Sequence, residues 1–170
     1  MEKKFNLLLC FFIAVAIITL LGFFNTYIKF LPDANKFPLA IHLHFAAFSC
    51  WLILLIIQPY LIKSRNTKLH KKVGKLTYFF APLLVWSIAL MAYNQIRREI
   101  ALPDNDAHIQ AFILLIDIIN FSLFYIIAMM NSKNLRWHVA FLIAATLVVL
   151  NPGLSRLLNK IEYGLGIVAA

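Results

Sequence analysis

Five runs of about 20 apolar residues dominate the chain, and each is long enough to cross the hydrocarbon core of a bilayer as a helix. We expect membrane-spanning helices over residues 6–25, 39–62, 74–95, 108–130 and 138–158. Apolar residue types make up 62% of the chain, more than a soluble domain of this size could bury. The sequence therefore predicts one all-α domain over residues 1–170, a polytopic membrane helix bundle with a four-helix core of helices two to five plus helix one.

Most of the 16 Lys and Arg residues lie outside the apolar runs, where basic residues act as topology signals rather than as a nucleic-acid surface. With the N-terminus inside, ten of them lie on the inner side and six on the outer side. Five of the seven acidic residues, two of them in the loop 101–106, lie outside. We expect no nucleic-acid partner and a multi-pass protein of the inner (cytoplasmic) membrane, in contact with the lipid bilayer, with a cytoplasmic N-terminus.

Both ends of the chain carry apolar segments that need an interpretation. The first run is long enough to span and no small-x-small cleavage site follows it, so we expect it to stay as a helix. The apolar tail after Glu162 is too short to cross a bilayer. Two readings stay open for it: a segment at the membrane interface, or the start of a sixth helix.

Histidines near the helix ends mark a candidate site in two layers. In the expected topology, His44 and His108 lie at the outer ends of the second and fourth helices, and His70 and His138 lie at the inner ends of the third and fifth. A neutral imidazole is costly in hydrocarbon and ligates haem iron and transition metals well. Two stacked bis-histidine haems would require this arrangement. Anchoring at the headgroups is the alternative for the inner pair, and helix capping for His108.

Helical phase, at about 100° per residue, places several polar residues on shared faces. His44 shares a face with Trp51 and Gln58 on the second helix. His138 aligns with Arg156 on the fifth, where the guanidinium could meet a haem propionate, a substrate carboxylate or an acidic side chain. These faces should point into the bundle.

Asp117 lies well inside the fourth span, where a carboxylate is expensive unless it is protonated, paired or in a wet cavity. It could be a metal ligand, a proton carrier or a group that orients a histidine. A structural pairing with Asn120 or Arg156 is the alternative. His108 falls about 180° from Asp117 on the helix, so it points away from the interior if Asp117 points inward.

The most distinctive motif opens the third helix and reads Leu69-His70-Lys71-Lys72-Val73-Gly74. Further residues accompany it along the chain: His44 and Gln58-Pro59 before it, and His138 and Arg156 after it. In these residues the chain resembles small uncharacterised bacterial polytopic membrane proteins that share the helix start Leu-His-Lys/Arg-Lys/Arg-x-Gly, a likeness that implies no activity. More distantly it resembles the cytochrome b-561-like transmembrane b cytochromes. That resemblance implies haem b held by histidines and a quinol or another redox partner. Asp117 has no place in that family's pattern.

Three functions follow from these residues, and whether the chain is an enzyme stays open. The leading prediction is a membrane electron-transfer protein with b-type haem, part of an oxidoreductase system, whose cofactor-binding set would be His44, Gln58, His70, His108, His138 and Arg156. The second is a metal-dependent intramembrane enzyme holding zinc or iron through several of His44, His70, His108, His138 and Asp117. The third is a transporter, channel or homo-oligomeric pore lined by Gln58, Asp117, Asn120 and Arg156.

Overall fold

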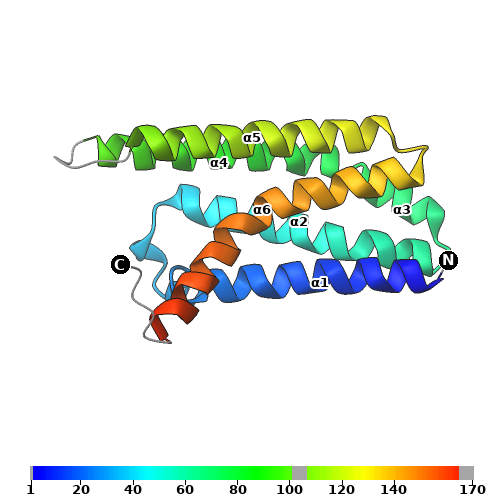
Figure 1. Cartoon of the computed structure of the whole chain (residues 1–170), viewed down its shortest axis with the longest axis horizontal. Coiled ribbons are helices and arrows are strands. Elements are labelled where there is room, and N and C mark those ends of the chain that lie inside the picture. The colour runs from blue at the N-terminus through cyan, green and yellow to red at the C-terminus, as the bar shows by residue number, and fades with distance from the viewer. Residues whose placement is uncertain (1, 101–106, 165–170) are drawn as a thin grey trace.

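The computed structural model describes residues 2–100 and 107–164, and every regular element in these two ranges is a helix (Figure 1). The long helices are α1 (Glu2–Phe24), α2 (Leu39–Lys63), α4 (Thr77–Glu99), α5 (Ala107–Met130) and α6 (Leu135–Gly164). The short ones are the 3-10 turns η1 (Ile28–Phe30) and η2 (Ala34–Lys36) and helix α3 (Thr67–Gly74). The helical stretches long and apolar enough to cross a membrane are Phe5–Phe24, Leu39–Lys63, Thr67–Asn94, Ala111–Met130 and Leu135–Lys160. The predicted all-α bundle with five such helices is confirmed.

The third span begins at Thr67, earlier than the predicted bound of 74, because the motif expected to open the third helix forms a short helix of its own, α3. Asn66 caps this helix, and its side-chain oxygen accepts a hydrogen bond from the backbone N–H of Leu69 at 3.1 Å. A search for apolar runs misses α3 because lysines occupy much of it. The last helix also differs, since α6 continues to Gly164, beyond the predicted end at 158. The loop 101–106 and the tail 165–170 lie outside the described residues.

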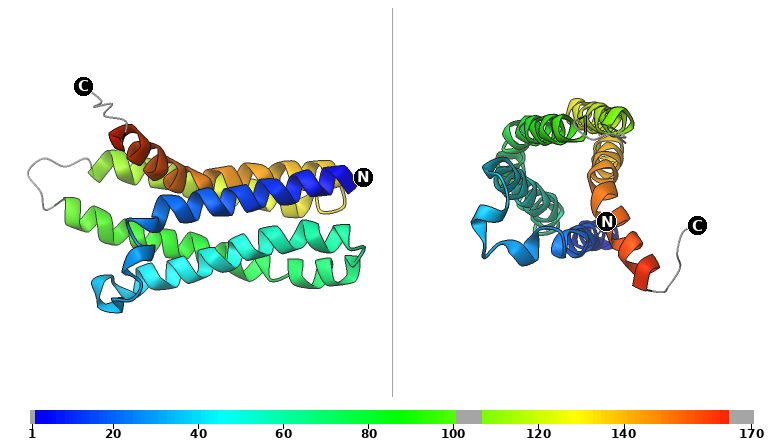
Figure 2. Two further views of the ribbon diagram at one scale, coloured as in Figure 1. Left: turned by 90° about the horizontal axis from the view of Figure 1, so that it is seen from below. Right: turned by 90° about the vertical axis from the view of Figure 1, so that its left-hand side faces the viewer.

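The five long helices form a closed ring, which Figure 2 shows end-on. Going round it, α1 packs against α2, α2 against α4, α4 against α5, α5 against α6, and α6 returns to α1. The sequence predicted a four-helix core of helices two to five with helix one added to it. In the structure α1 is part of the ring itself, because it packs against both α2 and α6. Because the ring encloses an interior, side chains from all five helices can meet there.

The two ends of the bundle carry different parts of the chain (Figure 1). What we call the N-terminal end carries the start of α1, helix α3 and the turn between α5 and α6. What we call the opposite end carries the connection 25–38, through which α1 leads into α2.

At the opposite end, α6 bends and crosses α1 in close contact (Figure 1). Pro152 lies inside α6, where a proline removes a backbone hydrogen bond and favours a bend. At the crossing, a Cβ atom added to Gly22 would clash with the carbonyl oxygen of Gly153. A Cβ atom on Gly153 would lie 3.0 Å from the Cα of Thr19. Small residues let two helix backbones touch, and here they fix where α6 lies against α1.

An aromatic layer fills the middle of the ring. The Trp51 ring lies 5.4 Å from Phe121 and 5.8 Å from Tyr125, measured between centroids, and all three side chains are buried. Phe121 and Tyr125, one turn apart on α5, are nearly parallel. Phe121 faces the opposite end of the bundle, whereas the Tyr125 hydroxyl reaches toward the N-terminal end. We call these three residues the aromatic layer, and it divides the interior into two polar regions.

Candidate functional site

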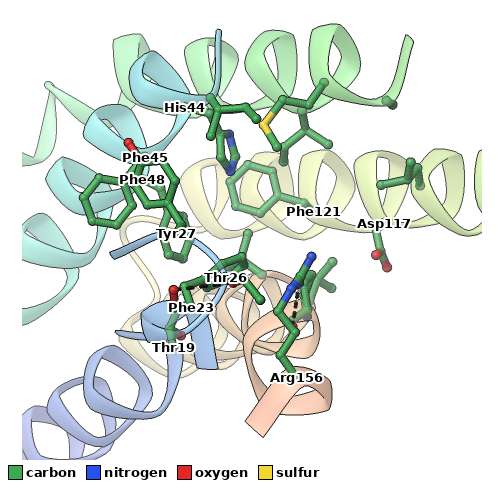
Figure 3. Close-up of a pocket in the computed structure, with 18 of the residues that line it drawn as sticks. Thr19, Phe23, Thr26, Tyr27, His44, Phe45, Phe48, Asp117, Phe121 and Arg156 are labelled. Atoms are coloured by element: carbon green, nitrogen blue, oxygen red, sulfur yellow. Dashed lines mark hydrogen bonds between the residues drawn. The ribbon is translucent and has the colours of Figure 1, made fainter. Parts of the chain in front are cut away.

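A cavity of about 290 Å³ lies inside the ring at the opposite end, and we call it the His44 cavity (Figure 3). Its wall is mostly apolar and contains six aromatic rings, those of Phe23, Tyr27, Phe37, Phe45, Phe48 and Phe121. Its other polar lining residues are Thr19, Thr26, His44, Asp117 and Arg156. An apolar wall with a few convergent polar groups is typical of small-molecule sites, and the volume is at the lower end of the range for such sites.

His44 is held in one tautomer by a buried serine on α4. Its Nδ1 lies 2.8 Å from Ser87 Oγ, and the Ser87 hydroxyl lies 2.8 Å from the carbonyl oxygen of Leu84. A carbonyl oxygen only accepts, so the hydroxyl proton goes to Leu84 and Ser87 Oγ accepts from the His44 Nδ1–H. The lone pair on Nε2 is then available. Figure 3 shows the imidazole of His44 directed from α2 into the interior.

Asp117 and Arg156 reach the cavity from α5 and α6 (Figure 3). The Arg156 Nη1 donates to the carbonyl oxygen of Pro152 at 2.9 Å, and the guanidinium lies 4.6 Å from the centroid of the Phe23 ring. The Asp117 carboxylate has no hydrogen bond or ion pair among the described residues. The structural pairing with Asn120 or Arg156 that the sequence left open is therefore not formed.

Thr19 lines the same cavity from α1. Its side chain is 1% exposed and its hydroxyl has no hydrogen-bond partner among the described residues. A helical threonine usually returns its hydroxyl to a carbonyl of the preceding turn, as Thr146 does with Leu142 at 2.7 Å. The Thr19 hydroxyl is thus enclosed by protein and not open to the cavity, whereas two polar groups at the cavity wall, the His44 Nε2 and the Asp117 carboxylate, have no protein partner in the described chain.

Tyr27 belongs to the connection 25–38, which joins the membrane-length helices α1 and α2, and its side chain forms part of the cavity wall. Its hydroxyl lies 2.6 Å from His42 Nδ1, and its ring packs against Phe37 and Phe45. Burial raises the pKa of the Tyr27 hydroxyl, so it stays protonated over the neutral range. His42 is not part of the cavity wall.

At the N-terminal end, Gln58 joins α2 to α3 through a set of contacts that we call the His70 network. The backbone decides the orientation of the Gln58 amide, because the Gly74 N–H can only donate and the His70 carbonyl can only accept. The Gln58 oxygen therefore accepts from Gly74 at 3.0 Å, and its nitrogen donates to the His70 carbonyl at 3.2 Å and to His70 Nδ1. His70 then carries its proton on Nε2, the reverse of His44.

Further hydrogen bonds extend the His70 network to α4 and α5. The Thr77 hydroxyl lies 2.7 Å from the Gly74 carbonyl and 3.0 Å from the Tyr125 hydroxyl. His138 lies close enough to His70 for their charges to interact, and its Nδ1 donates to the carbonyl of Ala128 at 2.8 Å. The predicted inner pair of histidines thus lies at the same end of the bundle, and the Nδ1 of each ring is hydrogen-bonded.

The predicted outer pair is not brought together. His44 lines the cavity, whereas His108 is exposed at the start of α5 and is not part of its wall. The reason is the helical phase already visible in the sequence, since Asp117 points inward and His108 lies on the other side of the same helix. The predicted placement of His44, Asp117 and Arg156 on inward faces agrees with the structure.

These positions test whether the chain could hold haem or a metal ion. The His44 cavity contains one imidazole, and at the other end His70 has its proton on the nitrogen that would have to bind iron. No three His, Cys, Asp or Glu side chains lie together in the described parts of the chain in a way that could hold a metal ion. The arrangement therefore does not fit the two bis-histidine haems or the His/Asp metal site expected from the sequence.

The expected polar path is also interrupted. Gln58 belongs to the His70 network and Asp117 to the His44 cavity, with the aromatic layer between them. Three residues important for the cavity were missed by the sequence argument: Thr19, Tyr27 and Ser87. Thr19 and Ser87 are hydroxyl side chains inside otherwise apolar spans, and a search for all polar residues in the spans would have found them.

No family model matches this chain, and neither a curated protein nor a solved structure shows detectable similarity to it.

Proposed function

We propose that this protein binds a small, lipid-soluble molecule with a polar head group in the His44 cavity. The observation that carries the proposal is the convergence of two unpartnered polar groups on one apolar cavity: the His44 Nε2 and the Asp117 carboxylate. Arg156 supplies a cation at the same wall.

The energetics favour a ligand at this place. A buried polar group without a partner costs about 1–3 kcal/mol, and an unpaired carboxylate inside a membrane costs more. A ligand that hydrogen-bonds these groups would recover part of that free energy. Its apolar part would gain from the Phe and Leu side chains of the wall.

The proposed setting is the inner membrane, with the N-terminus in the cytoplasm. The basic residues support this orientation, because more of them lie at the N-terminal end of the bundle, including the exposed Lys68, Lys71 and Lys72 of α3. In this orientation the His44 cavity lies in the outer half of the bilayer, where a molecule dissolved in the outer leaflet could reach it.

The first experiment measures saturable binding of three amphiphiles to the protein in detergent micelles. The probes are para-nonylphenol, decanoate and decylamine, whose head groups are neutral, anionic and cationic. A molecule that binds only the folded state raises the midpoint of thermal unfolding with its concentration. We expect this effect for at least one of the probes.

A matched pair of variants links such binding to the cavity. Ala92→Phe fills the cavity, because Ala92 lines it and is 9% exposed. Ala89→Phe places the same ring on the exposed face of the same helix. Binding that disappears in the first variant and persists in the second supports the proposal. If no probe binds, or if both variants bind equally, the His44 cavity is not a binding site.

A further inference from the structure

We infer that the ligand of the His44 cavity is a neutral molecule with one aromatic ring and a ring hydroxyl, a lipid-soluble phenol, and that this hydroxyl donates to the Nε2 of His44. This inference rests on the proposed function and names the ligand class for the same cavity. It follows from four properties of the cavity: its charge, its acceptor, its rings and its size.

The charges of the cavity favour a neutral ligand. Asp117 and Arg156 lie at one wall, and with Asp117 ionised their opposite charges offset each other at a distance. An anionic head group would then be attracted by Arg156 and repelled by Asp117, and a cationic head group would be attracted by Asp117 and repelled by Arg156. Neither an anionic nor a cationic head group therefore recovers in the cavity the hydration free energy that it loses on leaving water.

His44 selects a head group that donates a hydrogen bond. Ser87 fixes the proton on Nδ1, so the nitrogen turned toward the cavity is an acceptor. A hydroxyl satisfies it, whereas an ether or ketone oxygen does not. Because a phenolic O–H is more acidic than an alcohol, it is the better donor to an imidazole nitrogen.

The six aromatic rings of the wall favour an aromatic ligand. Phe48 already stacks on the His44 ring, with a centroid distance of 6.1 Å and an interplanar angle of 13°, and Phe121 lies at the base of the cavity. Aromatic pairs gain about 0.5–1.5 kcal/mol beyond the apolar area that they bury. A ring whose hydroxyl reaches His44 Nε2 would lie within contact of these side chains.

The volume limits the ligand to one ring. An engineered apolar cavity of about 150 Å³ binds benzene in another protein, so a cavity of about 290 Å³ has room for a single substituted ring. An alkyl chain longer than a few carbons would have to leave between the helices into lipid. The ligand class is thus a phenol whose ring is enclosed and whose chain reaches the membrane.

The test compares three molecules of nearly the same shape on the unmodified protein. The probe para-nonylphenol has both the ring and the donor, para-nonylanisole has the ring without the donor, and para-nonylcyclohexanol has the hydroxyl without the aromatic ring. We expect para-nonylphenol to bind about tenfold more tightly than either analogue, since each lacks one interaction with the cavity and a tenfold change corresponds to about 1.4 kcal/mol. Equal affinity of phenol and anisole would overturn the donor assignment, and equal affinity of phenol and cyclohexanol would overturn the aromatic class.

Two variants assign the acceptor. His44→Phe keeps a ring against Phe48 and removes the nitrogen, so we expect it to reduce the tenfold preference for phenol over anisole to about onefold. His108→Phe makes the same change at an exposed position outside the cavity and should keep the preference. A preference that survives in His44→Phe would contradict the assignment. Should His44→Phe fail to fold, the three probes on the unmodified protein still decide the ligand class.

The outcomes separate this inference from the proposed function. Cavity-dependent binding of decanoate or decylamine in preference to the phenol would leave the His44 cavity a binding site and overturn the phenol assignment. Absence of cavity-dependent binding for all probes would remove both.

Discussion

The His44 cavity and the His70 network are two polar regions of similar composition that differ in how many of their polar groups have a hydrogen-bond partner within the protein. Each contains a histidine and a hydroxyl side chain from a neighbouring helix. In the His70 network, Gln58 satisfies Nδ1 and the carbonyl of His70 and the N–H of Gly74 at once. In the His44 cavity, Ser87 satisfies one nitrogen of His44 and leaves the other facing space.

This difference separates a structural cluster from the cavity that we propose as a binding site. A polar network whose members are all paired rigidifies a membrane protein, because breaking any bond leaves a polar group in a medium without water. A cavity with unpartnered groups costs stability, and such a cost is typical of positions kept for function. We therefore propose opposite roles for histidines that look equivalent in the sequence.

The largest expected effect is the loss of Gln58. Gln58→Leu should lower the free energy of unfolding by about 3 kcal/mol, because three polar groups on the half-buried residues His70 and Gly74 lose their partner together. Denaturant titration in detergent micelles measures it. Asn120→Leu is the control, an amide without a hydrogen bond among the described residues. Equal effects of the two changes would mean that the His70 network does not stabilise the fold.

A smaller effect of opposite sign is expected in the cavity. Asp117→Leu should raise the free energy of unfolding by about 1 kcal/mol, since it removes a carboxylate that has no partner and adds apolar contacts. The same titration measures it. A loss of stability like that of Gln58→Leu would show that Asp117 is paired in the folded protein, and the two regions would then no longer differ.

The next prediction concerns Ser87 as a positioning residue. Ser87→Ala should weaken binding of para-nonylphenol by about threefold to tenfold, because His44 can then place its proton on either nitrogen. Ser87→Thr keeps a hydroxyl at the same place and should keep the affinity. Both variants should leave binding of para-nonylanisole unchanged. An equal loss for phenol and anisole would indicate a packing defect instead of a change of tautomer.

The smallest expected effect is the change in the absorption spectrum when hemin is added to the protein. Purified protein with added hemin should show no Soret band of a bound low-spin haem and no sharp α and β bands after reduction with dithionite. The reason is that His44 has no second imidazole in its cavity and His70 is held by Gln58 in the wrong tautomer. A bis-histidine spectrum that is lost in His138→Phe but kept in His108→Phe would show that the His70 network opens to bind haem.

Local information in the sequence was enough for much of the architecture. Runs of apolar residues located the five helices because the length of a span is set by the bilayer and not by partners. Helical phase turned His44, Asp117 and Arg156 inward and His108 outward, since residues on one rigid helix keep fixed angles to one another. The predicted third span began only at 74, although α3 begins at Thr67, because a capped, lysine-rich helix has no apolar signal.

The sequence alone thus determined a five-helix membrane bundle and the residues that face its interior. Only the tertiary structure decided which of them meet. The proton on His44 depends on a serine 43 positions away, and that on His70 on a glutamine 12 positions away, both on other helices. Gly22 and Gly153 meet only because α6 closes the ring against α1. Hydrogen-bond partners and cavities are properties of helix packing, which the periodicity of a single helix does not contain.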